Sequence, residues 1–392
     1  MRKHLDRTVR RHLHRAALGL TTAALLVGCG ADDPTTTSGK ADAPATSAEA
    51  TAAASWLAGQ LDDGLMHSSY EDPPGSGTWV TVADHGLSLD ALFALREVEG
   101  YADERGAILD AIEPEADAYV GSGKNAYAGS TGKLLRAVQV EDDDPATYAG
   151  GDLVARLERL VRRKPDDELG RAKDRWDAAD EFGGDYSNTI GQSWVVRALT
   201  GADSDLTDEA ASFLLAQQCA DGFFRLLMES EDHTCDGGTP EESKPSVDAT
   251  AFAAQALLEL QDAGVEVDVA PALDDAAAWL VAQQAGDGSF VDADSGAANA
   301  NSTGVAAEAL LLLGEEDAAD QARAWLVDHQ VTSDSAGEEL AEQAGAVAFD
   351  DAALDKAQDK GITRAVRYQW QRATAQAVAG LAGGTSGGAS GS

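Results

Sequence analysis

The stretch Gln218-Cys-Ala-Asp-Gly222-Phe-Phe224 decides the fold of this chain, because two other stretches repeat its pattern. The other copies are Gln60-Leu-Asp-Asp-Gly64-Leu-Met66 and Gln284-Ala-Gly-Asp-Gly288-Ser-Phe290. Each copy has Gln, three residues, Gly, one residue and then a large apolar side chain. Each follows one Ala-rich helical segment and precedes another. A pattern that returns at matching places indicates a repeat architecture, which constrains the fold more than any single motif does.

A second pattern follows each copy and predicts the second helix of a helical hairpin. It is clearest at Asp248-Ala-Thr250-Ala-Phe-Ala-Ala-Gln-Ala256-Leu257, where Thr250 and Leu257 lie two helical turns apart on one face. The segment from Asn301 to Leu310 matches it position by position. In six segments the Thr250 position is held by Ser88, Thr131, Gln192, Thr250, Thr303 and Thr374. We expect this Thr column to pack between helices and to satisfy backbone carbonyl groups.

The first helix of each hairpin ends in an aromatic residue followed by Leu. Four segments show this pair, at Trp56, Phe213, Trp279 and Trp325. The second and third repeats lack it, and we expect their outer helices over 107–119 and 152–163. No sustained alternation of β-branched residues predicts a strand. The sequence therefore predicts an all-α protein with outer and inner helices in alternation, interrupted by inserts at 164–182, 226–244 and 331–361.

The two patterns together, Gln-x₃-Gly-x-aromatic and Asp-x-Thr-x₂-Ala-x₂-Ala-Leu, resemble the repeat of the squalene cyclase and prenyltransferase superfamily. The resemblance covers most of residues 51–382 and is strongest over 207–315. It implies an (α/α)₆ toroid, in which six inner helices form a closed ring inside six outer helices. In this chain Trp is never the aromatic residue of the turn. The resemblance is specific for fold and unspecific for function.

The catalytic motifs that the resemblance would imply are absent from the sequence. A class II terpene cyclase needs Asp-x-Asp-Asp on the wall of its cavity, and the most similar segment here is Glu141-Asp142-Asp143-Asp144. Those residues precede Pro145, so we interpret them as a solvated loop. A protein prenyltransferase holds zinc with Asp, Cys and His, but His233 and Cys235 lie in a polar insert. We therefore predict neither a metal site nor a cofactor.

A toroid that acts on carbohydrates would need two carboxylates across its cavity, and Asp84, Asp185 and Asp248 could face a common rim. More generally, we expect the N-termini of the inner helices to line the central cavity. The ligand-binding candidates there are His85, Tyr186, Asn188, Gln192, Trp194, Asp248, Asn301, Trp370 and Arg372. This polar set suits a sugar, a peptide or a polar cofactor better than a hydrocarbon. For Asp248 and Asn301, helix capping is the alternative interpretation.

The N-terminal segment has the pattern of an export signal. Six basic residues precede an apolar run of twelve residues, 16–27, which is too short to span a bilayer. The run ends in Leu26-Val27-Gly28-Cys29, which resembles the lipobox of bacterial lipoproteins. That resemblance implies removal of the signal peptide, residues 1–28, and lipidation of Cys29. The alternative is an ordinary cleaved signal that leaves Cys29 unmodified.

Composition indicates how the rest of the chain behaves. Residues 29–50 and 383–392 have few bulky side chains, so we expect a disordered tether and a disordered Gly/Ser tail. The formal charge of −39 excludes nucleic acid as a partner, because phosphate groups would be repelled. In an oxidising compartment outside the cytoplasm, Cys219 and Cys235 predict a disulfide, with zinc binding as the rival use.

These observations favour a membrane-anchored extracytoplasmic lipoprotein with a non-catalytic toroid. The expected partners are the lipid bilayer, through acylated Cys29, and a small molecule, a glycan or another protein. A divergent terpene cyclase, a prenyltransferase-like enzyme or a carbohydrate-active enzyme is the alternative. Two carboxylates across one cavity, one of them strongly desolvated, would favour an enzyme. A filled central channel would favour a structural envelope protein that uses only its outer surface.

Overall fold

The computed structural model describes residues 46–165, 168–181, 183–228, 233–236, 239, 243–291, 296–333 and 338–383. The predicted signal peptide, Cys29 and residues 384–392 of the predicted tail lie outside the described residues. The first described helix, α2 (Ala48–Ala58), begins within the segment assigned to the tether. Ser47 caps it, since the Ser47 hydroxyl accepts the N–H of Ala50 at 3.0 Å.

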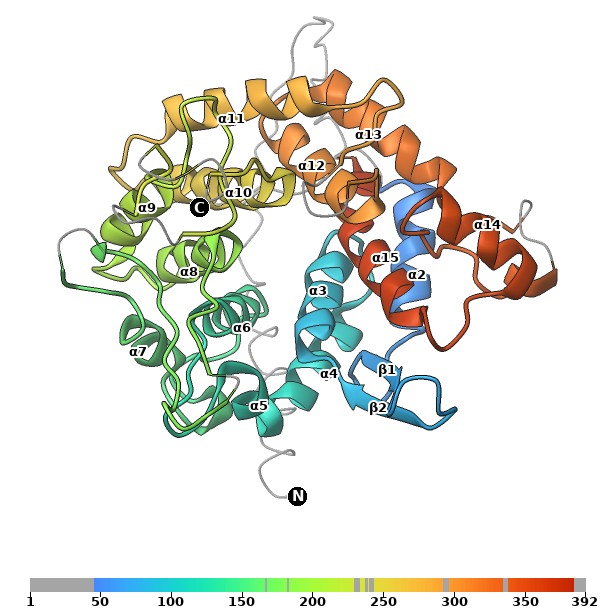
Figure 1. The fold of residues 1–392 in the computed structure, drawn as a ribbon, viewed down its shortest axis with the longest axis horizontal. Helices are drawn as coiled ribbons and strands as arrows, with labels where there is room; N and C mark the ends of the chain where they lie inside the picture. Colours follow the sequence, from blue (N-terminus) through green and yellow to red (C-terminus); the bar gives the residue numbers. More distant parts are fainter. Residues whose placement is uncertain are drawn as a thin grey trace, which may run out of the picture. The chain divides into compact units, whose positions relative to one another are not determined.

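The helical hairpins follow the predicted order and close into a ring. The inner helices are α3 (His85–Arg96), α6 (Ala128–Val140), α8 (Thr189–Gly201), α10 (Val247–Asp262), α12 (Ala300–Leu312) and α15 (Arg367–Ala382). The outer helices are α2, α4 (Ala102–Ile112), α7 (Leu153–Glu158), α9 (Thr207–Leu215), α11 (Ala270–Gln283) and α13 (Glu316–Asp328). Figure 1 shows the inner helices around a common centre. Each inner helix packs on the next, and α15 packs on α2 and α3, so the ring is closed.

Two of the predicted outer helices have different bounds. The helix expected over 107–119 begins earlier, as α4, and stops before Pro114, whose ring cannot continue the hydrogen-bond ladder. A short helix, α5 (Ala116–Val120), follows it. The helix expected over 152–163 ends at Glu158, because Val161 leaves it to pair with Ala172.

A β-hairpin interrupts the first repeat, and the sequence patterns did not predict it. Strand β1 (His67–Glu71) pairs antiparallel with β2 (Trp79–Ala83), with His67 opposite Ala83. Both strands have five residues and half-buried or exposed side chains, so they lack the alternation that marks a strand in sequence. The hairpin does not change the fold class, which is all-α as predicted.

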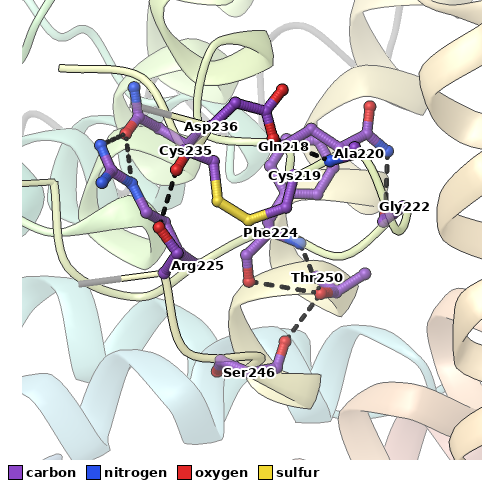
Figure 2. The surroundings of a disulfide bond; sticks show 12 residues. Gln218, Cys219, Ala220, Gly222, Phe224, Arg225, Cys235, Asp236, Ser246 and Thr250 are labelled. Carbon is purple, nitrogen blue, oxygen red and sulfur yellow. Dashed lines mark hydrogen bonds between the residues drawn. A yellow bond between two sulfur atoms is a disulfide. The ribbon is translucent and has the colours of Figure 1, made fainter. Parts of the chain in front are cut away.

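The Thr column joins each turn to its inner helix. Thr250 Oγ1 accepts the N–H of Phe224 at 2.9 Å and donates to Ser246 O at 2.7 Å (Figure 2). The same hydrogen bond from the turn is accepted by Ser88, Thr303 and Thr374. The predicted role with carbonyl groups is thus confirmed for Thr250, and the hydroxyl also fixes the apolar end of the turn.

In the fourth and fifth repeats, the Gly and Gln of the repeated stretch join the turn to the next outer helix. In the first repeat only Gly64 does so, because Gln60 Nε2 donates to Trp56 O of its own helix. Gly288 has φ +92°, and a Cβ there would lie 2.2 Å from Gln321 O in α13. Gln284 Nε2 donates to Ala318 O of the same helix at 2.8 Å. Only glycine combines this backbone conformation with so close an approach. The repeated stretch is therefore a structural joint between neighbouring hairpins.

The joint that closes the ring has the same contacts, although an insert separates its Gln from its Gly in the sequence. Gln330 Nε2 donates to Glu49 O in α2 at 2.9 Å. Gly345, with φ +98°, lies so close to α2 that a Cβ would be 2.1 Å from Ala52 O. The last turn therefore holds the first helix just as the earlier turns hold their neighbours.

In the third repeat, one residue replaces both the Gln of the turn and the Thr of the inner helix. Gln192 Oε1 accepts the N–H of Ala172 at 2.8 Å, as the Thr column does elsewhere. Its Nε2 donates to Gly170 O at 3.0 Å and to Ala210 O in α9 at 2.9 Å. The interpretation of Gln192 as a ligand-binding residue is therefore wrong, because its side chain is fully engaged in the joint.

The predicted disulfide is confirmed. Cys219 and Cys235 are bonded, and both are buried beside the turn of the fourth repeat (Figure 2). The N–H of Cys235 also donates to Ala216 O at 3.0 Å. The bond thereby ties the insert between α9 and α10 to the joint, and it leaves these cysteines no free thiolate for zinc.

Candidate functional site at the centre of the ring

Three aromatic side chains meet across the centre of the ring. The ring of Trp194 in α8 stacks on Phe93 of α3 at a centroid distance of 4.8 Å and lies 6.0 Å from Phe252 of α10. α3 and α10 are first and fourth in the order of inner helices, so they face each other across the ring. Trp194 therefore lies at the centre as part of an aromatic bridge, and its role as a ligand contact stays a prediction.

Charged side chains of the inner helices converge beside this bridge. Glu259 of α10 accepts hydrogen bonds from Arg197 of α8, at 2.8 and 2.5 Å, and pairs with Arg136 of α6 at 3.1 Å. The Arg197 guanidinium also lies 4.5 Å from the centre of the Trp194 ring. Burial alone would raise the pKa of Glu259, but the two guanidinium groups outweigh it and hold the pKa below its usual range.

Glu308 of α12 is the carboxyl group that this network leaves without a cation of its own. Gln255 Nε2 donates to Glu308 Oε2 at 3.1 Å, and no ion pair to Glu308 occurs within the described ranges. Burial, together with the charge of Glu97, raises the pKa of Glu308 from 4.5 to about 7. Burial also raises the pKa of Glu97. With a pKa of about 7, Glu308 is protonated below neutral pH, unlike Glu259.

The raised pKa of Glu308 gives a testable dependence of stability on pH. The folded state binds this proton more tightly than the unfolded state, so the stabilisation is complete below pH 4.5 and is lost as the pH rises through 7. Glu308→Gln keeps the shape and removes the titration. At pH 8 we expect it to be more stable than the parent by up to about 3 kcal/mol. Urea unfolding from pH 4 to pH 8 measures this, and parallel curves for both proteins would contradict it.

The predicted rim residues on α3 and α8 are only partly available to a ligand. His85 Nε2 lies 3.2 Å from Glu115 Oε2, so this imidazole has a partner within the protein. Asn188 caps α8 by accepting the N–H of Gly191 at 2.9 Å. Tyr186 is 63% exposed, and it remains a candidate contact at the surface of the rim.

Asp248 and Asn301 do not cap their helices, contrary to the alternative interpretation of these residues. The cap of α10 is Ser246, whose hydroxyl accepts the N–H of Ala249 at 3.1 Å. The cap of α12 is Asn299, which accepts the N–H of Ser302 at 3.0 Å. Asp248 and Asn301 each lie two residues further along, in the first helical turn, where they remain predicted contacts for a ligand.

Trp370 and Arg372 separate onto different faces of α15. Trp370 is 1% exposed and lines a cavity between α15 and α14 (Asp351–Lys360), so the expectation that it lines the centre of the ring is wrong. Arg372 Nη2 lies 3.7 Å from Asp84 Oδ2 of the neighbouring inner-helix cap. Arg372 thus keeps a place at the rim, with a partner already beside it.

Two of the three carboxylates predicted for the rim have structural roles. Asp84 caps α3 by accepting the N–H of Leu87 at 3.0 Å, and Asp185 accepts a hydrogen bond from Arg171 at 2.9 Å. The carboxyl groups that do converge are Glu97, Glu259 and Glu308, which sequence reasoning missed. A usable signal was the helical spacing of Phe252, Gln255 and Glu259, which places an aromatic, an amide and a carboxylate on one face of a helix.

Neither a metal centre nor a membrane span emerges from the part of the chain that the structure describes. Among the described residues, no group of three or more His, Cys, Asp or Glu side chains could hold a metal ion. Within the same ranges, no helix combines the length and the apolar character needed to cross a bilayer.

Known proteins similar to this chain were found only among solved structures. No family model matches the chain, and no curated protein does. The type II terpene cyclase MstE from Scytonema superimposes with a TM-score of 0.55 at 13% identity, over 85% of this chain and 96% of that one. Unsaturated glucuronyl hydrolase from Bacillus sp. GL1 gives 0.56 at 14% identity, over 83% and 95%. A protein from Actinoplanes gives 0.52 at 17% identity, over 85% and 97%.

At such low identities the likeness concerns fold and not activity. The cyclase and the hydrolase carry different activities on similar architectures, as common folds often do. Together with the closed ring of inner and outer helices, the likeness shows that this chain folds as an (α/α)₆ toroid.

Proposed function

We propose that this chain is an exported lipoprotein, anchored through Cys29, whose toroid binds a small polar molecule at the centre of the ring without catalysing a reaction. The observation that carries the proposal is Glu308, a carboxyl group that accepts a hydrogen bond from Gln255 and interacts with Arg197, Glu97 and Glu259, with a pKa raised to about 7. Such a group can both donate and accept a hydrogen bond at neutral pH.

The energetic cost of Glu308 supports a functional role. A carboxyl group whose pKa is raised in the folded state lowers stability above that pKa, and glutamine would fit the same space without this penalty. Ionisable groups with strongly perturbed pKa values cluster at functional sites, where stability is given up for binding or chemistry.

The surroundings of Glu308 restrict the class of ligand. Phe93, Trp194 and Phe252 bridge the centre of the ring, and the charged side chains of Arg197 and Glu259 adjoin them. Guanidinium, carboxyl and amide groups next to an aromatic bridge suit a small polar molecule such as a sugar. A glycan fragment is therefore the favoured class, and a protein partner is an outcome that the test below separates.

Native mass spectrometry of the full-length protein, extracted from membranes, tests the binding proposal. We expect a small molecule to co-purify at pH 6 and to be lost at pH 8.5, because Glu308 then ionises. Glu308→Gln should retain the molecule at both pH values, since the amide still donates, and Glu308→Leu should lose it at both. If repeated preparations of the protein contained no bound molecule, this result would contradict the proposal and favour a structural or protein-binding role.

A second candidate function is an enzyme that uses Glu308 as a general acid. A carboxyl group with a pKa of about 7 is suited to proton donation near neutral pH, and Glu97 supplies a second carboxyl group nearby. In that case Glu308→Gln would still bind the co-purified molecule but would abolish its turnover. Incubating the parent protein with that molecule and finding it chemically unchanged would exclude this candidate.

The anchoring part of the proposal is tested at Cys29. In the expression host, Cys29→Ser should move the protein from the membrane fraction to the soluble exported fraction, because lipid attachment at this thiol would be lost. The intact mass of the parent protein should exceed that of the polypeptide from residue 29 by the mass of the acyl groups. Equal fractionation of both proteins would refute the anchor and leave the proposal about the toroid untouched.

A further inference from the structure

A cavity lies between α14 and α15, outside the double ring of helices. Its volume is about 230 Å³. α14 belongs to the insert that follows α13 and is not one of the hairpin helices, and Figure 1 shows it outside the ring. The cavity is lined by Asp350, Ala352, Ala353, Lys356, Ala357, Lys360, Gly361, Thr363, Val366, Gln369 and Trp370. It is therefore distinct from the centre of the toroid.

Trp370 gives the cavity an apolar wall. Its side chain is 1% exposed and is one of the groups that line the cavity. An indole ring offers a large, rigid apolar surface against which a small ring can pack.

One stripe of α14 provides the opposite wall. Ala353, Lys356, Ala357 and Lys360 follow helical spacing, so they share the face of α14 that lines the cavity. The two alanines are small and leave room for a ligand. The two lysines are exposed, which places their ammonium groups where a ligand can reach them from solvent.

Among the residues that the structure describes, these lysines have no ion-pair partner, although the protein is strongly acidic. The chain carries a formal charge of −39, yet neither Lys356 nor Lys360 forms an ion pair in the described part of the molecule. The one carboxylate that lines the cavity, Asp350, already accepts the N–H of Ala353 at 2.7 Å. Asp355 and Asp359, also on α14, do not line it. The cavity therefore presents local positive charge beside an apolar wall.

We propose that this cavity is a second binding site, for a small organic anion with an apolar body, such as an aromatic carboxylate. The anionic group lies between Lys356 and Lys360, and the apolar body lies against Trp370, Ala353 and Ala357. The volume is below the range of about 300–1,000 Å³ that is typical of sites for drug-sized ligands. The ligand is therefore small, of the size of one ring with a carboxylate.

Three probes separate the two parts of this recognition on the full chain. Benzoate has both an anionic group and an apolar ring, benzamide has only the ring, and acetate has only the charge. We expect benzoate to bind at least tenfold more tightly than either of the others, as measured by titration of the indole N–H signals in NMR spectra. The chain has seven tryptophans, and Trp370→Phe identifies the signal that should shift.

Variants of the cavity locate the site and test its chemistry. Replacing both lysines, K356Q with K360Q, should reduce the preference for benzoate over benzamide from at least tenfold to about onefold. Ala353→Leu should fill the cavity and abolish binding of all probes. Lys124→Gln is the matched control, because Lys124 is an exposed lysine paired with Asp177 elsewhere on the surface, and we expect it to leave the preference unchanged.

Several outcomes would overturn the proposal. Benzamide binding as tightly as benzoate would remove the anion preference, and unchanged selectivity in the double lysine variant would remove its assigned cause. Benzoate that shifts only the Trp194 signal would place the ligand at the centre of the ring instead. A thermal melt of each variant distinguishes loss of the site from loss of the fold.

Discussion

Replacing Gly345 with alanine should destabilise the toroid by about 2–5 kcal/mol. Two penalties combine at this position. The backbone has φ +98°, which disfavours any residue with a Cβ, and that Cβ would lie 2.1 Å from Ala52 O in α2. The clash with Ala52 O would push the last turn away from the first helix and so weaken the contacts that close the ring. Urea unfolding of parent and variant measures the difference.

Gly314 supplies the matched control for this experiment. It also has a positive φ, +84°, but a Cβ there would meet nothing within 4 Å. Gly314→Ala should therefore show only the backbone penalty, of about 1–2 kcal/mol. If Gly345→Ala were no less stable than Gly314→Ala, the close approach of the last turn to α2 would not contribute to stability.

Arg197→Met should destabilise the fold by about 2–4 kcal/mol, with a larger effect at pH 8 than at pH 5. The substitution removes the cation between Glu259 and the neighbouring carboxyl groups and leaves their charges poorly compensated. The pKa of Glu259 then rises, so folding favours the protonated carboxyl group. Stability falls as the pH increases through that range. Unfolding curves at the two pH values measure both the size and the sign of the effect.

Two further variants show whether the network is the cause. Arg323→Met removes an arginine from an exposed pair with Asp320, and we expect it to cost less than about 1 kcal/mol. Combining Arg197→Met with Glu259→Gln should recover part of the lost stability, because the unpaired charge is removed as well. A double variant as unstable as the sum of the single ones would show that the two side chains do not interact.

Much of the fold could be predicted because the repeated stretch encodes the joint itself. Gln284 supplies the hydrogen bond to the next outer helix, and Gly288 allows the close approach to that helix, so both contacts between hairpins are visible in the sequence. The disguised copies were missed for physical reasons. In the last repeat an insert separates Gly345 from Gln330 in the sequence. In the third repeat the glutamine is Gln192, which lies on the inner helix and reaches the equivalent carbonyl groups from there.

The centre of the ring could not be predicted with the same success. Acidic residues are so frequent that their identity does not reveal which of them face inward, and the network of Glu97, Glu259 and Glu308 depends on helix rotation. Trp370 illustrates the converse error. It belongs to an inner helix, as predicted, but faces outward because α14 covers that side of α15.

The joint between Gln330, Gly345 and α2 also determines how the molecule comes apart. Open solenoids have terminal units with a neighbour on one side only, and they lose these units first. Here the last turn contacts the first helix in the same way as internal turns contact the next outer helix, so every hairpin of the ring has a neighbour on both sides. We therefore expect no hairpin to unfold before the others, so that the twelve helices of the double ring unfold together in one cooperative transition.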